Sequence, residues 1–88
     1  MPAPKITIYT ASYCPYCARA KRLLDRKGVP YEEIDAEGDD ALRAWLVAKT
    51  GQQTVPQVFA GERSLGGFRD IDALDREGKL DPILHGEA

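Results

Sequence analysis

The strongest constraint on the fold is an alternation of short β-branched or aromatic segments with longer amphipathic segments. Strands are expected at residues 5–9, 29–34, 55–59 and 63–65, and helices at 15–27, 40–49 and 70–77. A strand–helix–strand unit implies a right-handed parallel crossover, and the turn at 60–62 adds an antiparallel hairpin. The order βαβαββα therefore predicts an α/β fold, a four-stranded mixed β-sheet flanked by three or four helices.

Size and composition favour one ordinary globular unit. The chain has 88 residues, enough for one core, and a single domain over residues 1–88 is expected. No apolar run approaches the roughly 18 residues of a membrane span, and no secretory h-region follows Met1, so we expect a cytoplasmic protein without a membrane partner. The net charge of −2 argues against nucleic acid as a partner. Trp45 and Phe59 are expected in the core.

Chemistry is concentrated at the two cysteines, Cys14 and Cys17. A bridge between residues three apart closes too short a loop to stabilise a fold, and a Cys-x-x-Cys beside a strand–helix unit indicates a redox site. Pro15 suits the first helical position, so Cys14 is expected where unpaired N–H groups and the helix dipole stabilise a thiolate. Cys17 lies one turn on and can reach it. Cys14 is thus predicted to attack a substrate disulfide, and Cys17 to resolve the mixed disulfide that forms. Lys5, Arg19 and Lys21 are candidate sources of positive charge near the cysteines.

Other interpretations of the same residues stay open. The cysteines could hold zinc shared by a dimer, or could be unreactive core residues, although Pro15 argues against the second possibility because it leaves Cys14 outside the helix. His85, the one histidine, is expected in a solvated tail. The acidic residues of segment 32–40, including Glu33, are expected to form a solvated face.

Three separated motifs resemble those of the dithiol glutaredoxins, members of the thioredoxin superfamily. They are Cys-Pro-Tyr-Cys at 14–17, Thr-Val-Pro-Gln-Val-Phe at 54–59 and Gly-Gly-Phe-Arg-Asp at 66–70. The resemblance implies a thioredoxin-like fold with a redox-active disulfide, acting in electron transport and cell redox homeostasis. It implies reduction of protein disulfides and glutathione mixed disulfides, with glutathione as co-substrate and no permanently bound cofactor or metal. The implied partners are glutathione and disulfide-bearing or glutathionylated proteins, and we expect a monomer.

The resemblance also implies where glutathione lies. Tyr16 would flank it, the backbone of Val55 would pair with it beside a cis bond to Pro56, and Asp70 would hold its γ-glutamyl end. From the residues alone, Asp70 could equally cap the last helix. The full set of expected glutathione-binding residues is Tyr16, Gln53, Thr54, Val55, Pro56, Gly67, Phe68, Arg69 and Asp70.

Two positions depart from the family pattern. Ala11 stands where many relatives have lysine, and Gln52-Gln53 stands where many have a basic residue. Because of these changes, a second interpretation stays open, in which the chain is a glutaredoxin-like redoxin reduced by thioredoxin reductase. An iron–sulfur carrier, with one cysteine from each of two subunits, is a further alternative. Pro15 counts against that carrier because it stiffens the loop.

Overall fold

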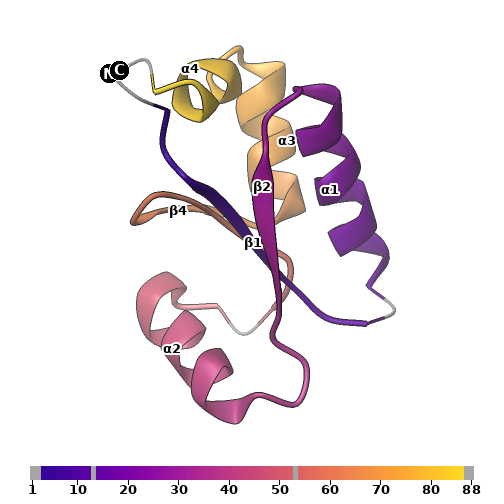
Figure 1. The fold of residues 1–88 in the computed structure, drawn as a ribbon, viewed down its shortest axis with the longest axis vertical. Helices are drawn as coiled ribbons and strands as arrows, with labels where there is room; N and C mark the ends of the chain where they lie inside the picture. The colour runs from indigo at the N-terminus through magenta and orange to yellow at the C-terminus, as the bar shows by residue number, and fades with distance from the viewer. Residues whose placement is uncertain (1–2, 13, 53, 87–88) are drawn as a thin grey trace.

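Four strands and four helices make up residues 3–12, 14–52 and 54–86, which are the parts of the chain described by the computed structural model. In chain order they are β1 (Ile6–Thr10), α1 (Pro15–Arg26), β2 (Tyr31–Asp35), α2 (Asp40–Thr50), β3 (Gln57–Ala60), β4 (Arg63–Gly66), α3 (Phe68–Arg76) and α4 (Leu80–Leu84) (Figure 1). The predicted order is confirmed, and the short helix α4 is added to it. Within the described ranges, no helix has the length and apolar character to cross a membrane.

The pairing of the two central strands brings two loops together. The strand order is β2-β1-β3-β4, with β1 parallel to β2 and antiparallel to β3, and with β3 antiparallel to β4. Because β1 and β2 run parallel, α1 crosses between them over one face of the sheet. Tyr9, near the end of β1, lies opposite Gln57, the first residue of β3. The loop that leaves β1 and the loop that enters β3 therefore meet at one end of the sheet.

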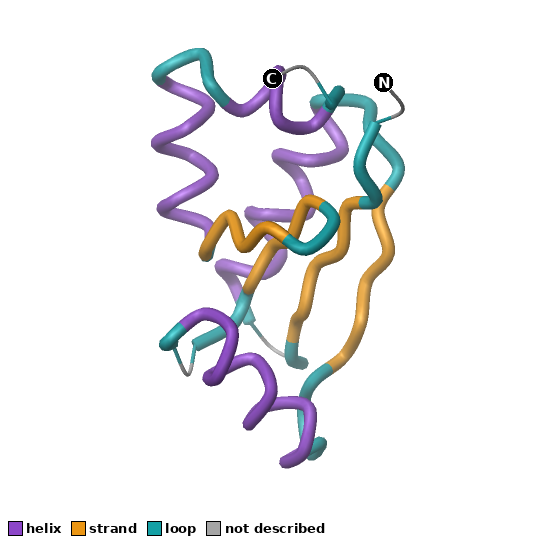
Figure 2. Tube along the Cα trace, turned by 90° about the vertical axis from the view of Figure 1, so that its left-hand side faces the viewer, coloured by secondary structure: helices purple, strands orange, loops and turns teal. Residues whose placement is uncertain are grey.

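Side chains alternate across the sheet and build two cores. Ile8 of β1 points to one face and packs with Leu24 of α1 and Ile71 of α3. Tyr9, the next residue, points to the other face and packs with Leu46 of α2. Helices α1, α3 and α4 thus cover one face, and α2 covers the other (Figures 1 and 2).

The predicted starts of two strands were two residues too early. β2 begins at Tyr31 rather than at residue 29, and β3 begins at Gln57 rather than at residue 55. Pro30 and Pro56 directly precede these strands, and a proline has no N–H to donate to a ladder. The Val55–Pro56 peptide bond is cis, as the family resemblance implied.

The C-terminal helices also differ from the prediction. The last predicted helix begins at Phe68 rather than at residue 70, because Gly67 is its N-cap and the Asp70 carboxylate accepts the Gly67 N–H at 2.9 Å. It ends at Arg76, ahead of Gly78, whose φ is +74°. A separate helix, α4, then begins at Leu80.

Trp45 was wrongly predicted to be a core residue, since its side chain is 41% exposed. Its ring centroid nevertheless lies 5.7 Å from those of both Tyr9 and Phe59. Trp45 therefore covers the rim of the core beneath α2, whereas Phe59 is buried as predicted.

We expect α4 to contribute to the stability of the larger core. Leu84 is 1% exposed and packs into that core, so Leu84→Ala should leave a cavity and lower the free energy of unfolding by about 2–5 kcal/mol. Val47→Ala, at an exposed site on α2, is the control and should change it by no more than about 0.5 kcal/mol. Urea unfolding followed by circular dichroism compares the two. Equal unfolding free energies would contradict the docking of α4.

Candidate active site

Cys14 lies at the start of α1, as predicted. It is the N-cap residue, its backbone is extended, and Pro15 occupies the first helical position. The Cys14 Sγ accepts the Cys17 N–H at 3.2 Å, and the thiol donates to the Val55 carbonyl oxygen at 3.7 Å. Cys14 is partly exposed, and its sulfur meets the positive end of the helix dipole, an arrangement that stabilises a thiolate.

Cys17 has a different environment, although it lies only one turn away. Its side chain is 2% exposed, and both cysteines are free thiols. Burial, followed by the hydrogen bond with Cys14, raises the pKa of Cys17 from 9.0 to about 12. Cys17 is therefore a protonated thiol at neutral pH. The structure thus holds one partly exposed cysteine and one buried, protonated cysteine one helical turn apart.

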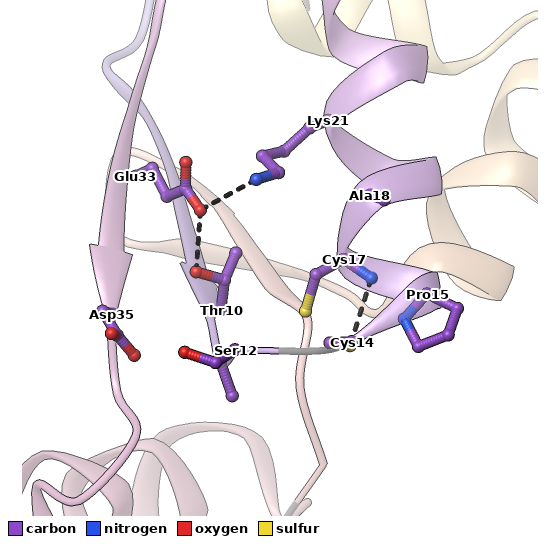
Figure 3. A pocket seen from close by; sticks show the side chains of 10 residues that line it. Thr10, Ser12, Cys14, Pro15, Cys17, Ala18, Lys21, Glu33 and Asp35 are labelled. Atoms are coloured by element: carbon purple, nitrogen blue, oxygen red, sulfur yellow. Dashed lines mark hydrogen bonds and ion pairs between the residues drawn. The ribbon is translucent and has the colours of Figure 1, made fainter.

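A hollow of about 640 Å³ between α1 and β2 borders both cysteines. Figure 3 shows the Lys21 ammonium of α1 turned across this hollow toward the Glu33 carboxylate of β2. Glu33 Oε2 accepts from Lys21 Nζ at 3.0 Å and from the Thr10 hydroxyl at 2.9 Å. These two hydrogen bonds lower the pKa of Glu33, and the bond to Glu33 raises that of Lys21. Glu33 therefore belongs to the wall of this hollow.

The Glu33 side chain is 41% exposed, as predicted for the solvated acidic face, but its ion pair with Lys21 was not predicted. The parallel register sets Ile8 beside Glu33 and Thr10 beside Asp35, which puts all four side chains on the face covered by α1. The alternation along β2 places Glu33 and Asp35 on the same face of the sheet. Which face that is depends on the register of β2 with β1.

The three cationic candidates have different surroundings. Lys5 precedes β1, at the far end from Cys14, and pairs with Glu32 at 2.9 Å. Lys21 lines the hollow beside the cysteines. The Arg19 guanidinium lies 5.4 Å from the ring centroid of Tyr16. Of these three candidates, the two on α1 are therefore the ones near the cysteine pair.

A second hollow, of about 340 Å³, brings together the residues that the resemblance assigned to glutathione. Its lining comes from three separate parts of the chain: Tyr16, Gln52, Thr54, Val55, Pro56, Gly67, Phe68, Arg69 and Asp70. Of the predicted set, Gln53 lies outside the described residues. The Cys14 thiol reaches this hollow through its bond to the Val55 carbonyl.

Gln57 supports this hollow and was missed by the sequence analysis. Its side chain is fully buried, and Nε2 donates to the Thr54 carbonyl at 2.9 Å and to Gln52 Oε1 at 3.0 Å. These bonds tie the segment before Pro56 to the first residue of β3. A polar residue next to proline in an otherwise apolar strand was the only sequence signal.

Two glycines, Gly66 and Gly67, lie close to residues in the wall of the second hollow. Gly66 has a φ of +90°, and a Cβ there would collide with the Asp70 carboxylate. A Cβ on Gly67 would lie 3.2 Å from the Pro56 carbonyl oxygen. Asp70 caps α3 through the Gly67 N–H, so the predicted capping role is confirmed. Among the residues with a described position, no three His, Cys, Asp or Glu side chains gather as a metal site would require.

Comparison with known proteins gives a consistent picture. Residues 6–65 match the family model for glutaredoxin. A glutaredoxin of Pseudomonas aeruginosa is 53% identical over 81 residues, which cover 92% of this chain and 96% of that protein. Glutaredoxin 3 of Escherichia coli K12 is 46% identical over 79 residues, covering 90% of this chain and 95% of that one.

Solved structures agree with this assignment and with the thioredoxin-like fold. The solution structure of a Brucella melitensis glutaredoxin superposes with a TM-score of 0.88 at 45% identity, covering 100% of this chain and 96% of that chain. A buckwheat glutaredoxin–glutathione complex superposes with a TM-score of 0.86 at 39% identity, covering 93% and 76%. The chain therefore belongs to the glutaredoxin family of thiol–disulfide oxidoreductases.

Proposed function

We propose that this chain is a dithiol glutaredoxin, a glutathione-disulfide oxidoreductase that reduces protein disulfides and glutathione mixed disulfides. The observation that carries the proposal is the position of Cys14, whose sulfur accepts a helix N-terminal N–H and contacts the Val55 carbonyl at the hollow. Cys14 is the nucleophile and Cys17 the resolving thiol. Glutathione is the electron donor and is bound only as a co-substrate.

The reaction consists of two thiol–disulfide exchanges. The Cys14 thiolate attacks one sulfur of the substrate disulfide, a bond forms to Cys14, and the other sulfur leaves as a thiolate that takes up a proton. In the dithiol route, Cys17 loses its proton to solvent, attacks the Cys14 sulfur and releases the second half of the substrate. Two glutathiones then reduce the Cys14–Cys17 disulfide and leave as glutathione disulfide. In the monothiol route, the mixed disulfide joins Cys14 to glutathione, and a second glutathione thiolate attacks the glutathione sulfur, which forms glutathione disulfide and releases the Cys14 thiolate. Two electrons pass to the substrate in either case, and two glutathiones supply them.

The second hollow is the proposed glutathione site. Tyr16 flanks the tripeptide, and the backbone of Val55 pairs with it as an added strand would. Asp70 and the backbone at Phe68 and Arg69 take its γ-glutamyl end, with Thr54, Pro56 and Gly67 completing the wall. The buckwheat relative whose complex contains glutathione supports this choice of ligand. Gln53 remains part of the proposed set.

The protein is proposed to act in the cytoplasm, since glutathione keeps thiols reduced in that compartment. It is also proposed to act as a monomer. Its protein substrates are disulfide-bearing or glutathionylated chains. The single domain expected from the sequence is part of this proposal.

Cys14→Ser and Cys17→Ser should separate the two routes. Cys14→Ser removes the thiolate that attacks the substrate disulfide and should abolish all exchange. Cys17→Ser should retain reduction of a small glutathione mixed disulfide and lose reduction of an intramolecular protein disulfide. Both activities are measured with glutathione and glutathione reductase, with Ser12→Ala as a control for a neighbouring hydroxyl. Activity in Cys14→Ser, or loss of both reactions in Cys17→Ser, would refute the assigned roles.

Alkylation should report the raised pKa of Cys17. Iodoacetamide reacts with thiolates, and a thiol that ionises near pH 12 stays protonated from pH 6 to pH 9. In folded Cys14→Ser, alkylation of Cys17 should therefore be slow over this whole range. In urea, the rate of Cys17 alkylation should rise as the pH increases through the ordinary thiol pKa of about 8.5. Mass spectrometry measures both rates, and equal rates in the folded and unfolded chain would disprove the protection.

Reduction by thioredoxin reductase is a second candidate, favoured by the uncharged side chains at two positions of the site. Ala11 lines the hollow beside the cysteines and Gln52 lines the proposed glutathione site, where a cation could otherwise hold a carboxylate. We expect turnover with glutathione and its reductase, and restoring charge with Ala11→Lys should lower the KM for glutathione. Turnover with thioredoxin reductase alone would instead show that the two substitutions changed the donor.

A further inference from the structure

Two arginines flank the exposed ring of Tyr16. The Arg19 guanidinium of α1 lies 5.4 Å from the ring centroid, and that of Arg69 of α3 lies 5.9 Å from it. Tyr16 is 43% exposed, and its ring centroid lies 6.3 Å from that of Phe68. Two helices distant in sequence therefore bring two guanidinium groups to one aromatic ring. We call Tyr16, Arg19 and Arg69 the arginine pair site.

Neither arginine is neutralised within the described residues. Among the described residues, Arg19 and Arg69 form no ion pair with a carboxylate. Such pairs are formed by Lys5, Lys21, Lys27, Arg76 and Lys79. Both side chains are exposed. A guanidinium held near an aromatic ring keeps its N–H groups available for a planar anion, and a carboxylate matches that geometry in a bidentate way.

The arginine pair site lies where a substrate must approach. Tyr16 and Arg69 line the proposed glutathione site, and Tyr16 is between the two cysteines in the chain. The hollow on the β2 side has the opposite character, because its Lys21 is already bound to Glu33 and Asp35 adds another carboxylate. Positive charge is therefore unpaired on one side of the cysteine pair and compensated on the other.

We propose that Arg19 and Arg69 select protein substrates with acidic residues next to the glutathionylated cysteine. The proposal rests on the proposed function and adds a substrate preference to it. Carboxylates that flank the substrate cysteine bind the two guanidinium groups while the mixed disulfide meets Cys14. The net charge of the chain, −2, would alone favour basic substrates, so a preference for acidic ones must come from local charge.

Three glutathionylated peptides of equal length test this, with glutamate, glutamine or lysine flanking the cysteine. Their reduction is followed with glutathione and glutathione reductase at low ionic strength. The wild-type kcat/KM should be about three- to tenfold higher for the glutamate peptide than for the lysine peptide. The ratio should shrink in added salt, because exposed charges are screened.

Arg19→Gln/Arg69→Gln should bring the ratio to one or below. Arg22→Gln/Arg26→Gln is the matched control, since it removes the same charge from exposed, unpaired positions of α1 that line neither hollow. The control should keep the wild-type ratio, and circular dichroism should show all variants folded. A ratio that persists without Arg19 and Arg69, or falls equally in the control, would overturn the proposal.

The outcomes separate this proposal from the proposed function. Equal turnover of all three peptides would leave the glutaredoxin activity standing and overturn the preference alone. Absence of turnover for every peptide would refute the proposed function, and the preference with it. A higher KM for glutathione in Arg19→Gln/Arg69→Gln with an unchanged peptide ratio would assign the arginines to the carboxylates of glutathione. That result would also overturn the proposal.

Discussion

The antiparallel pairing of β1 with β3 is the constraint on which the site depends. Tyr9 opposite Gln57 fixes the register, and that register brings the loop before α1 against the segment before β3. The contact between the Cys14 thiol and the Val55 carbonyl follows directly from it. A slip by one residue would turn Ile8 and Tyr9 to the wrong faces, and both cores would be lost together with the site.

Two chemically identical side chains acquire different properties one helical turn apart. Cys14 precedes the first turn and meets free N–H groups, whereas Cys17 points into the fold and loses contact with water. Desolvation then raises the pKa of Cys17, while the N–H of that same residue is donated to the Cys14 sulfur. The division of labour proposed for them thus arises from the backbone geometry of a helix start.

Much of this arrangement could be predicted from the sequence, because the signals were local. Pro15 predicted the helix start, and alternating segments predicted the element order and the mixed sheet. The family motifs predicted the other residues of the proposed glutathione site. Gln53, which was also predicted, lies outside the described residues. The ion pair of Glu33 with Lys21, the buried position of Gln57 and the exposure of Trp45 could not be predicted, because each depends on strand register or on how far α2 overlaps the sheet. α4 is five residues long, too short for its periodicity to be distinctive.

The two cores differ in how firmly they hold their helices. The core beneath α2 is buried through Tyr9, Ala36, Leu46 and Phe59, whereas the core on the other face extends over three helices. A helix held by few apolar contacts opens at a lower free energy than the molecule as a whole. Trp45, the single tryptophan of the chain, sits on that helix against Tyr9 and Phe59. Its fluorescence therefore reports the detachment of α2 separately from global unfolding, without any added label.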